Sequence, residues 1–271
     1  MPQMAKLARV LGFISPLLAA PAIAASEHDC MILPRQQIEI RSPVEAMIES
    51  IRVRRGDLVN RGQVIATLES GPERAALALA QSRATMHGEI KVAEARLDLA
   101  EKKLRRAEEL SKQNFVSANA RDEAEAEFRL ATEELQRARD NQRLAEFEAR
   151  RAAEVLALRT VRSPFTGVVM DVLLKPGEFG ATTIKDPIMR LAEIDILHVE
   201  TILPLSQYGK VKPGQTATVT LEAPIGGRYQ TKVKVVDPVT DAASGTFGVQ
   251  LELPNPKRTI PAGVKCRVNF S

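Results

Sequence analysis

Residues 162–178 read RSPFTGVVMDVLLKPGE, and residues 41–57 read RSPVEAMIESIRVRRGD, the same pattern 121 positions earlier. Arg, Ser, Pro and the later Gly coincide in the two copies, and apolar residues recur at matching places. Such runs around a glycine turn are typical of two short strands. Each copy leads to a further apolar run, VIATLE from Val64 and PIMRLAE from Pro187. The repeat therefore predicts the two halves of one small β-sandwich.

The chain between the copies favours helix. Between Glu73 and Ser163 it has no proline and a single glycine, Gly88, and Ala, Glu, Arg and Leu are strong helix formers. Apolar residues follow a four-three spacing, which predicts a coiled-coil seam. In the first half the seam is Leu79, Met86, Ile90, Ala93, Leu97, Ala100, Leu104 and Ala107. In the second half it is Ala124, Phe128, Ala131, Leu135, Ala138, Gln142, Ala145, Ala149, Ala152 and Leu156.

The stretch SKQNFVSAN, residues 111–119, interrupts this helical composition. Ser117 or Asn119 can cap the helix that follows it. The insertion is therefore predicted to be an antiparallel hairpin, with two arms of about 40 residues that extend about 60 Å.

After residue 193 the pattern changes to alternating strand-like runs separated by Pro and Gly turns. The runs are ILHVETIL, QTATVTLEA, YQTKVKVVD, GTFGVQLELP and GVKCRVNF. They predict a small β-barrel.

The first residues have the pattern of a secretory signal peptide. Lys6 and Arg9 precede an apolar run that Pro16 interrupts, and Ala22-Ile23-Ala24 is a small-x-small cleavage pattern. A membrane anchor is the alternative, but the run is shorter than the roughly 20 residues that a span needs. Without Lys6 and Arg9 the formal charge falls from +4 to +2. Lys and Arg are mixed with Glu and Asp along the helices, so we expect no nucleic-acid partner.

The order of these modules resembles the periplasmic adaptor proteins, also called membrane fusion proteins, of tripartite efflux pumps and secretion systems. The repeated unit, the hairpin between its copies and the stretch SGTFGVQLELPNPKRTIPAG carry the resemblance over about residues 31–270. It implies an elongated, multi-module α+β fold, in which a long antiparallel α-helical hairpin is inserted in a split biotinyl/lipoyl-like β-sandwich and a small β-barrel follows. The expected modules are a signal peptide (1–25), an N-terminal strand joining the barrel (26–37), the sandwich halves (38–70 and 159–193), the hairpin (71–158) and the barrel (194–271).

The resemblance also implies partners. The adaptor would bridge an inner-membrane transporter, on the barrel side, to a TolC-like outer-membrane channel at the hairpin tip, and would form a ring, expected to be a hexamer. Arg106, Leu110 and Ser117 resemble the Arg/Leu/Ser tip motif that contacts such channels. A resistance-nodulation-division (RND) transporter is the expected pump. The alternatives are an ABC or type I secretion exporter, or a free-standing coiled-coil scaffold.

Two further features of the family bear on this chain. Family members usually continue into a membrane-proximal domain built from both termini, and we expect this domain to be missing or reduced here. The adaptor pattern has a glycine at the position of Ala46. This chain keeps that glycine in the second copy, as Gly167.

A true lipoyl or biotin carrier is a further alternative, because it shares the sandwich. A carrier needs a modifiable lysine at the turn that joins the halves, where this chain reads ESGPE at residues 69–73. The EAMIES stretch has Ile48 where a biotinylation signature needs lysine. The sequence therefore argues against a carrier.

Cys30 and Cys266 are the two cysteines of the chain. In an oxidising compartment such a pair can form a disulfide, and we expect one because the first mature strand and the last barrel strand should lie side by side. The residues before Cys30, SEHD, do not suit lipid attachment, so a periplasmic protein without a lipid anchor is expected.

Neither enzyme nor cofactor is expected. His28, His87 and His198 occupy three different contexts and do not converge on a metal site, and His198 is expected at the surface or rim of a barrel strand. No GxSxG or Walker motif occurs. Met31, Met47, Met86, Met170 and Met189 are expected to be packing residues. The sequence does not identify the cargo.

Overall fold

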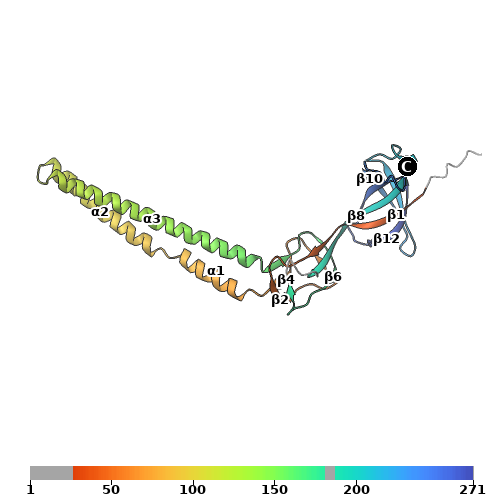
Figure 1. Ribbon diagram of the computed structural model, residues 1–271, viewed down its shortest axis with the longest axis horizontal. Coiled ribbons are helices and arrows are strands. Elements are labelled where there is room, and N and C mark those ends of the chain that lie inside the picture. The colour runs from red at the N-terminus through yellow and green to blue at the C-terminus, as the bar shows by residue number, and fades with distance from the viewer. Residues whose placement is uncertain (1–26, 181–186, 271) are drawn as a thin grey trace, which may run out of the picture. The chain divides into compact units, whose positions relative to one another are not determined.

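The computed structural model describes residues 27–180 and 187–270, and the chain divides into two compact units (Figure 1). One unit contains Pro34–Ile196 together with Asn255–Arg258, and the other contains the preceding N-terminal strand, Leu197–Pro254 and the chain from Thr259. The predicted signal peptide, residues 1–25, lies outside the described residues. None of the helices that the structure describes is both long enough and apolar enough to cross a bilayer.

Short strands alternate with one long helical insertion. The elements are β1 (His28–Ile40), β2 (Ala46–Ile51), β3 (Leu58–Val59), β4 (Val64–Leu68), α1 (Gly71–Ala84), α2 (Gly88–Lys112), α3 (Ala118–Ala157), β5 (Thr160–Arg162), β6 (Gly167–Val172), β7 (Phe179–Gly180), β8 (Met189–Pro204), the 3-10 helix η1 (Leu205–Gln207), β9 (Thr216–Leu221), β10 (Arg228–Val236), β11 (Thr246–Pro254) and β12 (Val264–Phe270). The boundary expected between residues 193 and 194 falls inside β8.

The sequence repeat is a structural repeat. β2 and β6 have the same pattern of buried and exposed residues, and so do β3 and β7. The Gly56 N–H donates to the Val169 carbonyl (2.8 Å), and the Gly177 N–H donates to the Ile48 carbonyl (2.9 Å). These are the same bond with the copies exchanged. Both glycines have left-handed backbone, with φ of 91° and 90°, which glycine adopts without steric cost.

Strand pairing completes each half of the sandwich in the same way. β2 pairs with β4 and β7, and β6 pairs with β8 and β3. The two halves bury one common core, which includes Ile48, Ile65, Leu68, Val169, Ile188 and Leu191. The predicted sandwich of two halves is therefore confirmed.

The structure explains why one copy has Ala46 where the other has Gly167. A Cβ atom at Gly167 would lie 2.4 Å from the Ala192 carbonyl oxygen and 2.7 Å from the Phe165 ring. The first copy has the smaller Val44 at the place of Phe165. Ala46 nevertheless keeps the strand and its buried position, so the departure leaves the local geometry of the repeat unchanged.

The insertion is a helical hairpin in which α3 packs against both α1 and α2. Every predicted seam residue of the second half is buried or half-buried, with Ala131, Leu135 and Ala138 most enclosed. Arg159 Nη2 donates to Glu73 Oε1 (2.5 Å) and links the base of α1 to the end of α3. The hairpin core of Ala93, Leu135 and Ala138 forms a cluster separate from the sandwich core.

The expectation of one continuous first arm is wrong. Residues 85–87 separate α1 from α2, and the Thr85 hydroxyl donates to the Gln81 and Ser82 carbonyls, a local bond that competes with helix continuation. The Gln142 side-chain amide donates to the freed Ala84 carbonyl. Gly88, a poor helix former, starts α2.

This break also changes the seam. Leu79 and Met86, predicted to be seam residues, are 56% and 66% exposed. In α1 the half-buried apolar positions are instead Leu77, Ala80 and Ala84, and the predicted phase is correct only from Ile90 onward.

The C-terminal unit is a β-barrel. Its strand order is β1–β12–β9–β10–β11–β8, and an additional pairing of β1 with β8 closes the ring. All five predicted strand runs are strands, and Val199, Leu203, Val219, Leu251 and Val268 fill the interior. Cys30 lies directly opposite Cys266 in the antiparallel β1–β12 pair.

Candidate docking site at the hairpin tip

The tip is the connection between α2 and α3, residues 113–117. The Leu110 carbonyl accepts hydrogen bonds from the N–H groups of Gln113 (3.2 Å) and Phe115 (2.9 Å), which ends α2. Asn114 takes the left-handed conformation, with φ of 62°, which asparagine tolerates better than most residues. The tip is therefore an ordered turn with a defined backbone.

Ser117 is the N-cap residue of α3. Its hydroxyl oxygen accepts a hydrogen bond from the Ala120 N–H (3.3 Å), so the prediction that Ser117 or Asn119 caps this helix is confirmed for Ser117. Such a cap satisfies an N–H group that has no partner within the helix.

Arg106 and Leu110 lie one helical turn apart on α2, where side chains four residues apart share a face. Arg106 is exposed and Leu110 is half-buried. Among the described residues, no ion pair or hydrogen bond joins Arg106, Leu110 and Ser117 to one another through their side chains.

Three basic residues near Arg106 on α2 have carboxylate partners. Lys102 pairs with Asp98 (2.7 Å), Lys103 with Glu127 (2.9 Å) and Arg105 with Glu101 (2.8 Å). Within the described part of the chain, the Arg106 guanidinium has no carboxylate partner. Arg106 is exposed, and a guanidinium can form strong charge-assisted hydrogen bonds.

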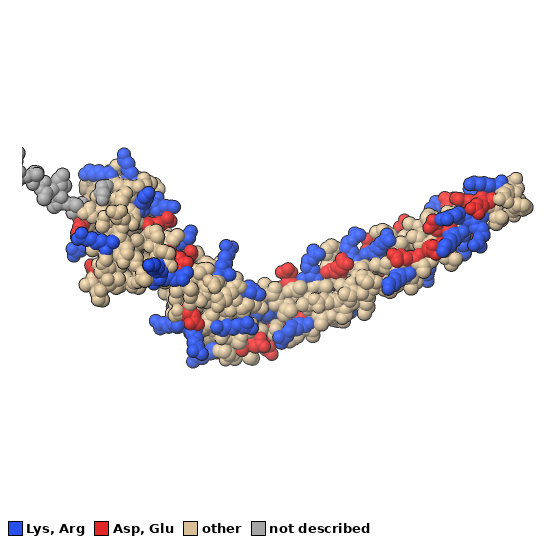
Figure 2. All heavy atoms as spheres, turned by 180° about the vertical axis from the view of Figure 1, so that it is seen from behind, with Lys and Arg blue, Asp and Glu red and all other residues tan. Residues whose placement is uncertain are grey.

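Opposite α2, Arg121 lies in the first turn of α3. Its Nη2 atom donates to Asp122 Oδ1 (2.6 Å), and this hydrogen bond raises the pKa of Arg121, with smaller contributions from Glu125 and Glu108. Arg121 thus has a partner within the chain, unlike Arg106. On the face shown in Figure 2, charges of both signs cover the hairpin towards its tip.

Phe115 was not among the predicted site residues, although it is a large apolar residue exposed at the tip. The residue is 74% exposed at the turn itself. The signal available in the sequence was a single aromatic residue, between Asn114 and Val116, in the segment that interrupts the helical composition.

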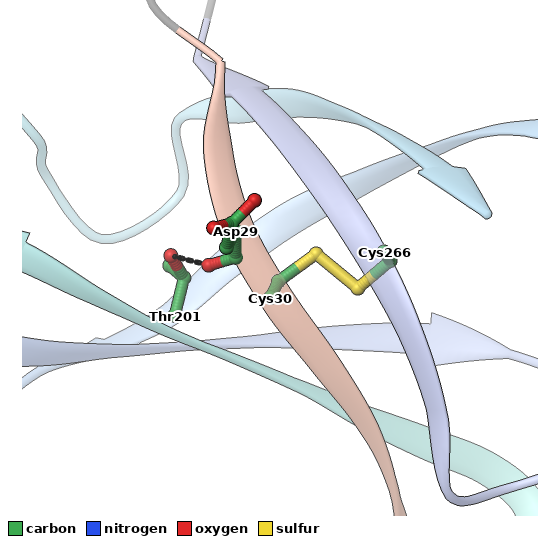
Figure 3. The surroundings of a disulfide bond; sticks show 4 residues. All are labelled: Asp29, Cys30, Thr201 and Cys266. Atoms are coloured by element: carbon green, nitrogen blue, oxygen red, sulfur yellow. Dashed lines mark hydrogen bonds between the residues drawn. A yellow bond between two sulfur atoms is a disulfide. The ribbon is translucent and has the colours of Figure 1, made fainter. Parts of the chain in front are cut away.

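The structure joins Cys30 and Cys266 by a disulfide, with sulfur atoms 2.10 Å and Cα atoms 4.8 Å apart (Figure 3). Beside it, the Thr201 hydroxyl of β8 donates to the Asp29 carbonyl of β1 (2.8 Å). The first and last strands of the barrel are thereby connected to each other and to β8.

The histidines lie apart from one another. His28 is near Gln207 and Phe270, His87 precedes α2, and His198 is half-buried beside Gln250. In the described part of the chain, no three His, Cys, Asp or Glu side chains form a group that could hold a metal ion.

The expectation that the methionines are packing residues is wrong for three of them. Met31, Met86 and Met170 are 45%, 66% and 38% exposed, whereas Met189 is fully buried. Met86 is exposed because it lies in the break between α1 and α2. Met31 and Met170 alternate with buried strand neighbours and face outward.

Comparison with known proteins covers both units. Residues 36–193 match the family model described as a CzcB-like barrel-sandwich hybrid domain, and residues 198–271 match an RND-type model described as a CusB-like beta-barrel domain. The nickel-cobalt-cadmium resistance protein NccB of Alcaligenes xylosoxydans xylosoxydans is 29% identical over 260 residues, which cover 89% of this chain and 59% of that protein. The macrolide export protein MacA of Yersinia pestis is 22% identical over 241 residues, which cover 87% of this chain and 64% of that protein.

This chain thus spans about 60% of the length of these two curated relatives. Among solved structures, MacA from Actinobacillus actinomycetemcomitans has a TM-score of 0.73 and 21% identity, covering 90% of this chain and 77% of that chain. At this identity the likeness shows the fold.

Proposed function

This chain belongs to the CzcB-like barrel-sandwich hybrid family of membrane fusion proteins, which are not enzymes, and we propose that it is a periplasmic adaptor of a tripartite efflux pump. The observation that carries the proposal is the family match over both sandwich halves and the hairpin between them, with an adaptor barrel following. An RND transporter is the proposed pump, because the barrel matches an RND-type model. An ABC exporter is the second candidate, supported by the resemblance to the macrolide export protein MacA.

In this proposal the modules keep the boundaries expected from the sequence. The sandwich is a split biotinyl/lipoyl-like fold of residues 38–70 and 159–193, the hairpin is 71–158 and the barrel is 194–271 with strand 26–37. Residues 1–25 would be a cleaved signal peptide, which would place the mature chain in the periplasm without a lipid anchor. The subunits would assemble into a ring, expected to be a hexamer.

The hairpin tip is the proposed contact with a TolC-like outer-membrane channel. Arg106 would donate to carbonyl or carboxylate groups of the channel, Leu110 would exclude water beneath it, and Ser117 would present the start of α3. Phe115, exposed on the turn, would add apolar contact. A single tip has little area, so about six tips in a ring would raise the overall affinity through effective concentration.

A site-specific photo-crosslinker at position 115 tests this contact in cells that carry the outer-membrane channel. We expect a crosslinked product that contains the channel protein, and none from the same crosslinker at Ala153, which is exposed near the other end of α3. Crosslinking of the channel at both positions, or at neither, would contradict tip docking and would favour the free-standing scaffold.

A further inference from the structure

The two flanks of the hairpin formed by α2 and α3 differ in chemistry. A residue directly before a seam residue faces the same flank of the hairpin on α2 as on α3. Five large aliphatic side chains occupy such positions. They are Val92, Leu99, Leu130, Leu144 and Val155, with exposures of 57%, 56%, 63%, 59% and 44%. We call this side the apolar flank.

The opposite side has the positions directly after the seam, and we call it the charged flank. It includes Glu94, Asp98, Glu101, Arg129, Arg139 and Arg143. Arg139 and Glu94 form an ion pair across the two helices on this side (3.8 Å). Among the described residues of α2 and α3, no exposed large apolar side chain lies directly after the seam.

The apolar flank is also hollowed. One hollow of about 560 Å³ contains Val92, and another of about 220 Å³ lies between Leu99 and Leu130. Both are bordered by Arg96 and Glu134, so they form one groove along the helix pair. Val92 and Leu99 are seven residues apart, the repeat of a coiled coil. The groove therefore fits a long helix that runs along the hairpin.

The chain itself contains such a helix with complementary charge. On the apolar flank α2 has a net charge of +2, from Glu89, Arg96, Lys103 and Arg106. On the charged flank it has a net charge of −2, from Lys91, Glu94, Asp98, Glu101, Arg105 and Glu108. In α3 the net charges are reversed. The apolar flank has −2, from Glu123, Glu127, Glu134, Arg137, Glu148 and Arg151, and the charged flank has +2, from Glu125, Arg129, Arg139, Arg143, Glu146 and Arg150. When two hairpins lie parallel with unlike flanks in contact, α2 of one copy lies against α2 of the other, and α3 lies against α3. Unlike net charges therefore meet along both helices.

We propose that the apolar flank of one hairpin packs on the charged flank of a second, parallel copy. The aliphatic stems of the arginine and glutamate side chains would cover Leu99 and Leu130 while their charged groups remain in water. Contact between unlike flanks is heterologous and can repeat until a ring closes. The inference rests on the proposed adaptor ring and names the surfaces that form it.

A contact between two apolar flanks is the competing arrangement. Such a contact is isologous and ends at two chains. It would leave both charged flanks uncovered and could not extend into a ring.

Cysteine crosslinking distinguishes these arrangements in the purified full chain, with Cys30 and Cys266 left oxidised. Leu99→Cys and Glu101→Cys are combined in one chain and treated with a short bis-maleimide. We expect a ladder of dimers, trimers and larger species, because each copy reacts with the next. The matched control combines Ala95→Cys, exposed on the outward face of α2, with Glu101→Cys and should give no ladder.

Two results would overturn the proposal. Leu99→Cys alone could give a dimer as efficiently as the pair with no larger species, which would indicate contact between apolar flanks. Alternatively, the paired variant could remain uncrosslinked while sedimentation shows only monomers at every concentration tested.

A substitution test gives the size of the effect. Leu99→Glu should weaken self-association about tenfold or more, whereas Ala95→Glu should leave it nearly unchanged, since buried interface residues dominate affinity. Both measurements use the purified chain without channel or transporter. If the protein gives a ladder but does not bind the channel, the proposed interface is supported and only the adaptor function is contradicted.

Discussion

The sandwich and the barrel close their cores in different ways. In the sandwich two copies of one strand unit exchange the same backbone bonds, Gly56 with Val169 and Gly177 with Ile48. In the barrel the first strand lies beside the last, and a disulfide joins Cys30 to Cys266. The sandwich therefore distributes its stability over equivalent positions, whereas the barrel depends on a bond between residues 236 positions apart.

The largest expected effect follows from removing that bond. In the chain-entropy model a loop of this length stabilises by about 5 to 6 kcal/mol. Reduction or Cys30→Ser should lower the free energy of barrel unfolding by up to that amount. Both tyrosines, Tyr208 and Tyr229, lie in the barrel unit and the chain has no tryptophan, so tyrosine fluorescence during urea unfolding reports on the barrel.

Thiol titration of the denatured, unreduced protein provides the chemical check. Almost no free thiol is expected. Two free thiols per chain in material purified from the periplasm would refute the pairing and show that no disulfide links the first and last strands of the barrel.

The repeat has Ala46 in the first copy and Gly167 at the matching position of the second. Substitutions at these two positions should have smaller effects. Gly167→Ala places a Cβ atom against the Ala192 carbonyl and should destabilise the sandwich by about 1 to 3 kcal/mol, the usual range for overpacking. The reciprocal change, Ala46→Gly, should cost about 0.5 to 1 kcal/mol through backbone entropy. Amide hydrogen exchange in β2 and β6 measures both. Equal costs would show that the copies are equivalent even where their neighbours differ.

Deleting the hairpin should change the sandwich least. β4 and β5 are antiparallel neighbours, with Thr67 opposite Thr160, so a short turn can replace residues 71–158. The hairpin has its own core, and long insertions cost little loop entropy. Circular dichroism should show a cooperative β-rich protein without helix. A molten or aggregated product would show that the hairpin is part of the sandwich core.

The same contrast explains what could be predicted from the sequence. The repeat was readable because each strand needs alternating apolar residues and each turn needs a glycine, as at Gly56 and Gly177. The seam of α3 was readable because nothing interrupts its heptads. The break before Gly88 was not, since it depends on the Thr85 hydroxyl and on Gln142 reaching from another helix.

The site was predictable only in part. The capping role of Ser117 follows from local chemistry. The lack of a carboxylate partner for Arg106 does not, because Arg105 and Lys103 have equally acidic surroundings in the sequence and are paired. Spatial pairing distinguishes these three residues, and a linear pattern does not record it.

The most direct test of the adaptor account compares export by Arg106→Asp with export by Lys102→Asp. Lys102 lies one turn from Arg106 on the outward face of α2, and its reversal removes only an exposed pair with Asp98, typically worth about 0.3 to 0.5 kcal/mol. Both variants should keep the helicity and thermal stability of the wild type. The account predicts that Arg106→Asp abolishes efflux-dependent resistance while Lys102→Asp retains it. Equal loss in both variants, or full export by Arg106→Asp, would contradict docking through the hairpin tip.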